Sequence, residues 1–258
     1  MSVLPEAFYL PADDGGFEPT RATQSLWDPD AQHGGPPTAL LAHVLDGSAA
    51  AGTRMARISV DFLGPIPRRP ARVAVTELRP GRLVRLAQAD LVIDGRAAVT
   101  ARAWYIATGP TPPVETPSAP PPPVPSAPDR PQTVASSDFG YGQAIEWRFT
   151  ESDAPGTTGV WTRVRVPLVA GQDLTGLARA LIVADSANGL SLTLPPDRWL
   201  SIPPTMTATL LRPPTGEWVH MECRTHLSDD GLGLAEATLR DPKGLLAEVA
   251  QPLLIRAR

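Results

Sequence analysis

The stretch Phe62-Leu63-Gly64-Pro65 has a counterpart about 150 residues further along the chain, Leu210-Leu211-Arg212-Pro213. Each stretch follows a segment in which apolar and polar residues alternate, as in a half-buried strand. Gly81-Arg82-Leu83 and Gly231-Leu232-Gly233 are a second pair at the same offset. The chain has 258 residues, enough for two domains of ordinary size. We therefore predict two copies of one structural unit.

A proline-rich segment separates the two copies. Eleven of the 31 prolines fall between Pro110 and Pro131. Proline lacks the backbone N–H and fixes φ, so this segment can form neither a helix nor a central strand. We predict a semi-extended connector at residues 108–135, between an N-terminal unit at 1–107 and a C-terminal unit at 136–258. A proline-rich ligand for a partner domain is the alternative interpretation.

Each copy contains one predicted helix and a run of predicted strands. In the first copy the helix runs from Pro36 toward Gly52, with Gly47 and Gly52 as its candidate stops, and its two prolines suit a first helical turn. The strands are predicted at residues 56–62, 71–79, 83–94 and 98–106, with a hairpin turn at Asp94-Gly95. In the second copy the helix covers 174–187, and the strands are predicted at 159–168, 205–210, 218–227, 232–240 and 245–255.

The helix of each copy can bury its apolar side only against the adjoining sheet. A long helix laid across a curved antiparallel sheet is the hotdog arrangement. The predicted fold is therefore α+β, a double hotdog whose two units pair side by side as the subunits of a dimer do. A single large β-sandwich with two insertions is the alternative.

The bulk composition excludes several classes of function. The net charge is −4 and no long basic run appears, so nucleic acid is not an expected partner. Cys223 is the single cysteine, which rules out a disulfide within the chain. No apolar stretch approaches the ~20 residues that span a bilayer, and the N-terminus does not resemble a signal peptide. We expect a cytoplasmic protein with no membrane contact.

Two segments carry candidate catalytic groups. Leu177, Leu181 and Ile182 belong to one apolar helix face, and Asp185 is the next position on that face. A carboxylate there is either a catalytic base in a partly dry site or a turn residue at the helix end. In the stretch Gln32-His33-Gly34-Gly35-Pro36-Pro37, the glycines leave backbone N–H groups open at a helix N-terminus, where a thioester carbonyl could bind. A tight turn into the helix is the alternative.

No metal or cofactor site is predicted. His220, Cys223 and His226 look like a metal cluster, but on a strand the two histidines lie ~20 Å apart and the cysteine faces the other side. Phosphate-binding and dinucleotide-binding glycine patterns are absent from the sequence.

The chain resembles the double-hotdog acyl-CoA thioesterases, the group around bacterial acyl-CoA thioesterase II. The resemblance is carried by His33-Gly34-Gly35, by Asp185 and by the terminal stretch from Ala247 to Arg256. It implies an enzyme of fatty-acid metabolism that hydrolyses acyl-CoA or another acyl thioester to a free acid and a thiol.

The resemblance also implies a set of site residues at the junction of the two copies. Asp185 and Gln251 match the family's catalytic Asp and Gln, which orient and deprotonate a water molecule. The family's catalytic Thr falls on Pro203, and Thr205 two residues later is the candidate for its role. His33, Gly34 and Gly35 are the implied substrate-binding residues.

Two other functions remain open from the sequence. A hotdog hydratase or dehydratase carries a motif similar to Asp-x-Asn-Pro-x-x-His, and the stretch that begins at Asp185 lacks its Pro and His. A non-catalytic protein that binds acyl thioesters is the other possibility, favoured by the absent Thr. Paired hotdog sheets commonly associate further, so we expect a homo-oligomer, a dimer or larger.

Overall fold

The computed structural model describes residues 4–112, 120–127, 139–150 and 156–258. The first half of the chain consists of β1 (Tyr9–Pro11), β2 (Phe17–Pro19), the 3-10 turn η1 (Arg21–Thr23), α1 (Gly35–Gly47), β3 (Thr53–Phe62), β4 (Ala71–Arg79), β5 (Val84–Ile93) and β6 (Arg96–Ala107). The second half consists of α2 (Gly140–Gln143), β7 (Ile145–Thr150), β8 (Thr157–Val164), α3 (Gly176–Ala184), α4 (Ala187–Leu190), β9 (Trp199–Ile202), β10 (Thr205–Leu210), β11 (Trp218–Leu227), β12 (Leu232–Asp241) and β13 (Gly244–Ala257).

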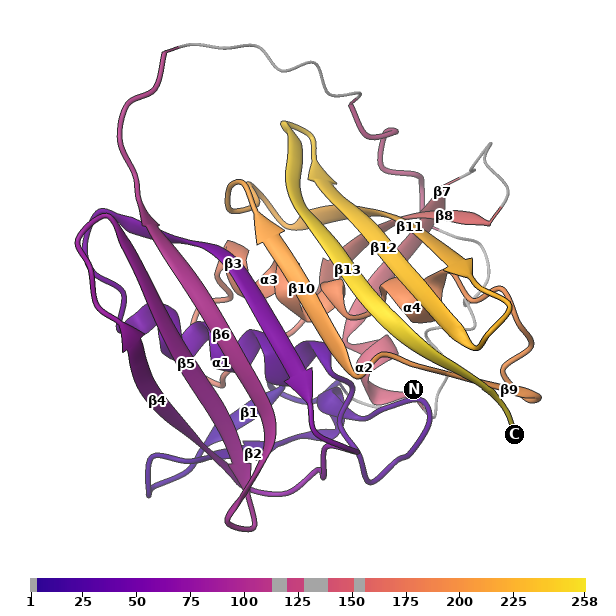
Figure 1. The fold of residues 1–258 in the computed structure, drawn as a ribbon, viewed down its shortest axis with the longest axis horizontal. Coiled ribbons are helices and arrows are strands. Elements are labelled where there is room, and N and C mark those ends of the chain that lie inside the picture. The colour runs from indigo at the N-terminus through magenta and orange to yellow at the C-terminus, as the bar shows by residue number, and fades with distance from the viewer. Residues whose placement is uncertain (1–3, 113–119, 128–138, 151–155) are drawn as a thin grey trace.

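The strands of both halves form one antiparallel sheet, in the order β1-β2-β4-β5-β6-β3-β10-β13-β12-β11-β8-β7, with β9 paired to β13 (Figure 1). The halves meet at β3 and β10, where Ser59 faces Thr207. On their other sides, Ser59 pairs with Arg102 of β6 and Thr207 pairs with Ala250 of β13. Ser59 is separated from Thr207 by the same number of residues as Arg102 is from Ala250. The two halves are therefore related by an approximate two-fold axis at the centre of the sheet.

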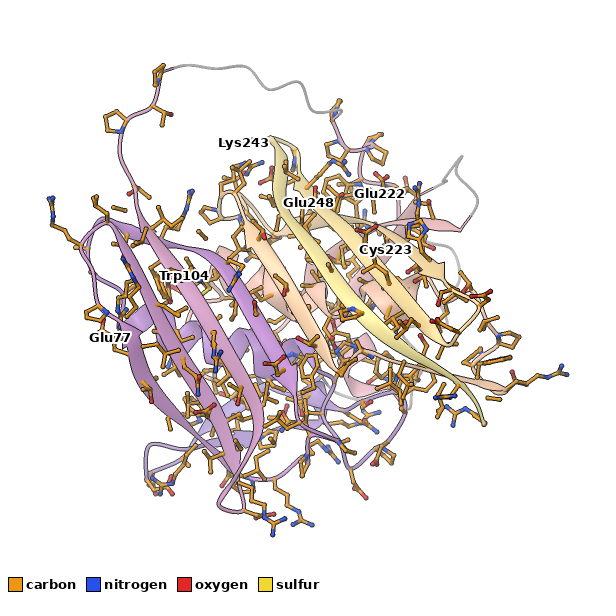
Figure 2. All side chains as sticks on the ribbon, viewed as in Figure 1. Glu77, Trp104, Glu222, Cys223, Lys243 and Glu248 are labelled. Carbon is orange, nitrogen blue, oxygen red and sulfur yellow. The ribbon has the colours of Figure 1, made fainter. Side chains whose placement is uncertain are left out.

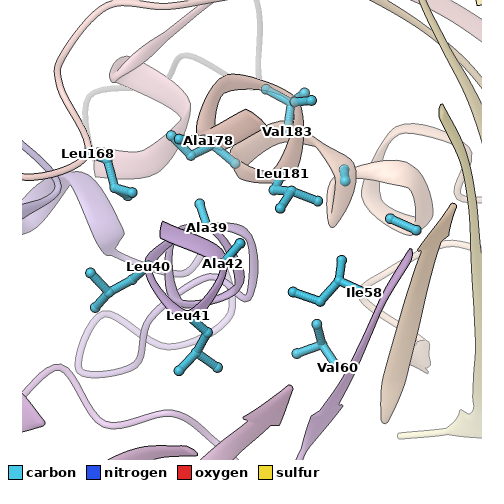
Figure 3. Close-up of a cluster of buried hydrophobic side chains, with 14 of the residues drawn as sticks. Ala39, Leu40, Leu41, Ala42, Ile58, Val60, Leu168, Ala178, Leu181 and Val183 are labelled. Atoms are coloured by element: carbon cyan, nitrogen blue, oxygen red, sulfur yellow. The ribbon is translucent and has the colours of Figure 1, made fainter. Parts of the chain in front are cut away.

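The helices cover one face of this sheet. Figure 3 shows Leu41 and Ala42 of α1 packed near Ile58 and Val60 of β3, with Leu181 of α3 alongside. All five side chains are buried. The apolar faces of the two helices and the inner face of the sheet therefore share one core, and the fold is the double hotdog. No helix among the described residues is long and apolar enough to cross a membrane.

The hairpin turn at Asp94-Gly95 is confirmed. Asp94 has φ 50° and Gly95 has φ 77°, the left-handed pair that a two-residue turn between antiparallel strands requires. It joins β5 and β6, whose residues pair from Ile93↔Arg96 onward.

The C-terminal ends of the two predicted helices have different outcomes. α1 ends at Gly47, the first of its two candidate stops, because Ser48 leaves the helical conformation, and Gly52 adopts φ 76° in the turn into β3. The predicted helix at 174–187 is divided into α3 and α4, with Asp185 and Ser186 between them. This break places the Asp185 carboxylate at a helix end instead of along a helix face.

The other face of the sheet is its outer face. Alternate residues of β6 divide between the two sides: Ala103 and Tyr105 are fully buried in the core, whereas Arg102 and Trp104 face outward. Figure 2 shows Trp104, Glu222 and Glu248 on this outer face. Polar and charged side chains dominate it, as expected for the solvated side of an antiparallel sheet.

Candidate active site

Asp185 lies at the C-terminal end of α3 and is only 8% exposed. Its Oδ1 accepts a hydrogen bond of 2.8 Å from Nε2 of Gln251, a fully buried residue of β13. The structure therefore brings together two residues that are 66 positions apart in the chain. The side-chain amide fixes the orientation of the carboxylate at the helix end.

The N-terminus of α1 faces the same carboxylate. Gly34 has no side-chain cap, and the backbone N–H groups of Gly34 and Gly35 hydrogen-bond to Asp185. A Cβ atom at Gly34 would lie 2.7 Å from Oδ2 of Asp185, and one at Gly35 would lie 2.0 Å from the carbonyl oxygen of Ile182. The two glycines are thus required because α1 and α3 approach each other so closely. The positive end of the α1 dipole lies against Asp185.

His33 contacts Asp185 from the side of the cavity. Its Nδ1 lies 3.2 Å from Oδ2 of Asp185 and accepts the N–H of Gly35 at 3.2 Å. The imidazole stacks on the ring of Tyr141 at a centroid distance of 3.9 Å and an angle of 5°. Burial lowers the pKa of His33 to about 3, so the ring is neutral at pH 7.

Tyr141 of the short helix α2 supports this arrangement. Its hydroxyl donates to the carbonyl oxygen of Ile182 at 2.8 Å and accepts from Oγ of Ser186 at 2.8 Å. The stack fixes the plane of His33, and the two hydrogen bonds fix Tyr141 to the end of α3. Tyr141 was not predicted, because a four-residue helix directly after the proline-rich segment leaves no periodic signal in the sequence.

The environment of Asp185 determines its proton affinity. Burial raises the pKa of the carboxyl group from 3.8 to about 7, against the opposing effect of the hydrogen bonds from Gly34, Gln251 and Gly35. A carboxyl group with this pKa can accept and return a proton near neutral pH. Its protonated form can donate from Oδ2 to Nδ1 of His33.

Asn188 extends the hydrogen-bond network from Gln251 toward β9. The backbone N–H of Asn188 donates to Oε1 of Gln251 at 3.1 Å. The side chain of Asn188 then forms two bonds with Ser201, since Nδ2 donates to its carbonyl oxygen at 3.0 Å and Oδ1 accepts from its hydroxyl at 2.7 Å. Neither Asn188 nor Ser201 was predicted. Asn188 stands three residues after Asp185 at a helix break, and that spacing was the available signal.

Thr205 is not part of this hydrogen-bonded group. Its hydroxyl donates to the carbonyl oxygen of Val60 at 2.8 Å, across the junction of β10 and β3. Pro203, two residues earlier, lines the cavity described below, and Ser201 does so as well. Among the cavity-lining residues, Ser201 therefore supplies the hydroxyl of this segment.

A cavity of about 500 Å³ opens beside Asp185. Asp185, His33, Gly34, Asn188 and Ser201 provide polar groups in its wall. Its apolar lining comes from both halves of the chain and includes Phe62, Ile66, Leu192, Leu194, Leu200 and Ile255. Gln251 and Gly35 do not line it. A mostly apolar cavity with a few converging polar groups is typical of a small-molecule binding site.

Two family models match this chain, and together they cover most of its length. Residues 23–106 match the acyl-CoA thioesterase N-terminal domain, and residues 117–255 match the acyl-CoA thioesterase C-terminal domain. The chain belongs to the acyl-CoA thioesterase family. This thioesterase hydrolyses acyl thioesters. No curated protein matches the chain.

Solved structures show the same fold. An acyl-CoA thioesterase II from Mycobacterium marinum is 16% identical with a TM-score of 0.68, over 88% of this chain and 90% of that one. A hot dog fold protein from Alicyclobacillus acidocaldarius is 19% identical with a TM-score of 0.75, over 98% and 97% of the two chains. A putative thioesterase II from Thermobifida fusca is 19% identical with a TM-score of 0.71, over 97% and 96%. At these identities the likeness establishes the fold of the thioesterase and not its site residues.

Proposed function

We propose that the cavity hydrolyses acyl thioesters of coenzyme A, with Asp185 as the general base. The observation that carries the proposal is a carboxylate in the wall of an apolar cavity, with a pKa of about 7 and an orientation fixed by Gln251. The acyl group occupies the apolar lining, and the thioester carbonyl lies beside Asp185 and the N-terminus of α1.

The reaction proceeds by attack of water on the thioester. Asp185 takes one proton from the water as its oxygen forms a bond to the carbonyl carbon. The carbonyl oxygen becomes negatively charged next to His33 and Gly34, where the positive end of the α1 dipole stabilises it. The tetrahedral intermediate collapses, the carbon–sulfur bond breaks, and the proton held by Asp185 passes to the leaving thiolate. The products are a free acid and a thiol.

Gln251 acts in this proposal as a positioning residue. It is fully buried and does not line the cavity, so it reaches the reaction through the Oδ1 atom of Asp185. Gly35 acts in the same indirect way, because it allows α3 to approach α1. In this proposal the hydroxyl of Ser201, which is hydrogen-bonded to Asn188, binds the attacking water. Thr205, which the resemblance implies, is the alternative residue for that role.

Replacing Asp185 tests the proposal. Asp185→Asn keeps the shape of the side chain and removes the base, so turnover of a panel of acyl-CoAs should fall at least ~100-fold. The released thiol is measured, and calorimetry records whether acyl-CoA still binds. Asp46→Asn is the matched control, since Asp46 also lies near a helix end with a pKa raised by burial but does not line the cavity. Unchanged turnover in Asp185→Asn would remove the carboxylate from the mechanism.

A further inference from the structure

The described part of the proline-rich connector, residues 120–127, lies against the second half of the sheet. Its partly buried positions are Pro121, Val124 and Pro125, while Pro122 and Pro123 are exposed. A polyproline II helix has three residues per turn, so positions three apart share one face. The run of prolines favours this helix, and the spacing of Pro121 and Val124 matches one that rests a face on the sheet. Figure 1 shows the segment arriving beside β7 and β8.

Two side chains of the sheet donate hydrogen bonds to the backbone of this segment. Nε1 of Trp161 donates to the carbonyl oxygen of Pro122 at 3.0 Å, and Nη1 of Arg148 donates to the carbonyl oxygen of Pro125 at 2.7 Å. The two carbonyls are again three residues apart, one helical turn of ~9 Å. A polyproline II helix has no internal hydrogen bonds, so its carbonyl groups are open to the donors of the sheet.

Trp161 belongs to the outer face of the sheet and is nevertheless only 1% exposed. Its neighbour Val160 points into the core. The indole lies 5.2 Å from the ring of His220, its partner across β8 and β11. His220 is 2% exposed, and neither of its ring nitrogens finds a hydrogen-bond partner among the described residues. The two rings therefore form a buried aromatic patch on the outer face, which is expected to be solvated.

Arg148 is held in place by groups of the sheet. Its Nε and Nη2 donate to Oε1 of Glu146 at 2.8 and 2.6 Å. Its guanidinium lies 4.6 Å from the centre of the Trp218 ring. The remaining Nη1 is the group that reaches Pro125. A donor fixed before its ligand arrives loses little conformational entropy on binding.

We propose that this part of the outer face, formed by Arg148, Trp161, Trp218 and His220, is a receptor for polyproline II segments. The chain's own residues 120–127 are its resident ligand, and an external proline-rich segment of the same period binds there when the resident segment is displaced. Aromatic side chains and an indole donor directed at proline carbonyls are the features that recognise polyproline helices in general. Because both hydrogen bonds go to backbone carbonyls, the recognition depends on the helix and not on one sequence.

A variant that frees the receptor tests the proposal in the full-length chain. Replacing Pro121, Pro122, Pro123 and Pro125 by Gly keeps the connector length and removes its preference for the polyproline helix. In tryptophan-labelled protein, the indole N–H of Trp161 should then exchange at least ~10-fold faster. A synthetic peptide of residues 120–127 should bind this variant and slow the exchange again. The parent chain should require at least ~10-fold more peptide, because its tethered segment competes at a millimolar effective concentration.

Two further variants locate the binding. Trp161→Phe, made in the glycine background, keeps an aromatic ring and removes the donor, so it should weaken peptide binding at least ~10-fold. Trp104→Phe is the matched control, a tryptophan on the outer face of the first half, and should leave the affinity unchanged. Acyl-CoA hydrolysis by each variant verifies the fold, since the cavity does not include these residues. No peptide binding to the glycine variant, or equal binding to the parent chain, would overturn the proposal.

Discussion

The equivalent helices α1 and α3 of the two halves of this thioesterase begin in different ways. α3 begins with a capping residue, since Oγ1 of Thr175 accepts the N–H of Ala178 at 3.1 Å. The N-cap of α1 is Gly34, which has no side chain to cap the helix, and the backbone N–H groups of Gly34 and Gly35 hydrogen-bond to Asp185. A capped helix start is stabilised by its own chain, whereas an uncapped one is available to a carboxylate or an oxyanion.

The last strands of the two halves, β6 and β13, also differ at equivalent positions. Gln251 of β13 occupies the position that Ala103 occupies in β6, as the register about Ser59 and Thr207 shows. The alanine fills the core, while the glutamine extends to Asp185. The two positions are equivalent in the fold, but one holds a buried alanine and the other holds the glutamine that hydrogen-bonds the proposed base. The following predictions test that contrast.

The largest effect is expected at the helix contact. In Gly35→Ala the new Cβ would meet the carbonyl oxygen of Ile182 at 2.0 Å, so α1 and α3 must separate. We expect the free energy of unfolding to fall by about 1–3 kcal/mol, together with a loss of hydrolysis. Gly47→Ala, at the other end of α1, meets no atom within 4 Å and should change the stability by less than about 1 kcal/mol. Thermal unfolding of both variants measures the difference.

The next effect concerns pH. In the proposed mechanism Asp185 acts as a base when ionised, so the rate should rise with pH through its pKa of about 7. The hydrogen bond from Gln251 lowers that pKa, so Gln251→Leu should move the midpoint to higher pH and lower kcat by about 10-fold to 100-fold. Gln88→Leu, a change on β5 of the other half, should leave the profile in place. A Gln251→Leu profile with an unshifted midpoint would contradict the positioning role.

A smaller effect on kcat is expected when the hydroxyl of Ser201 is removed. Ser201→Ala removes the hydroxyl that Asn188 holds in the cavity wall and should lower kcat about 10-fold. Thr205→Val removes only the bond to Val60, so it should cost about 1 kcal/mol of stability and leave kcat unchanged. Steady-state kinetics compares the two variants. The opposite ranking would assign the role to Thr205.

The smallest effect is expected at the capped helix. Thr175→Ala removes the cap of α3 and should lower the stability by about 1 kcal/mol without changing kcat. Denaturant unfolding combined with kinetics checks both parts. A selective loss of kcat would show that this helix start also serves the reaction.

Much of the fold could be predicted from the sequence because its signals are local. The alternation in β4, β10 and β11 predicts their bounds as the structure has them, and the Asp94-Gly95 turn joins adjacent strands. β7 and β9 were missed, since they are short and owe their strand conformation to pairing with β8 and β13. The helix break after α3 was missed because the apolar periodicity runs up to Asp185 without a proline.

The site could be predicted only in part. Asp185 and the two glycines stand out locally, as a charge on an apolar face and as an open helix start. Asn188 and Ser201 become neighbours through the pairing of β9 with β13, and Tyr141 reaches His33 from a segment that follows the connector. Such contacts depend on the tertiary arrangement and have no periodic signature. Gln251 was assigned through resemblance, and its burial behind the carboxylate became visible only in the structure.

The pairing of β3 with β10 has a consequence for folding. While the first half emerges from the ribosome, β3 is an open strand edge whose partner lies almost 150 residues downstream. Open edges of this kind invite pairing with other chains, and contacts so distant in sequence form slowly. Covalent fusion of the halves keeps the correct edge at high local concentration when it appears. The connector can therefore favour productive folding over aggregation on the nascent chain.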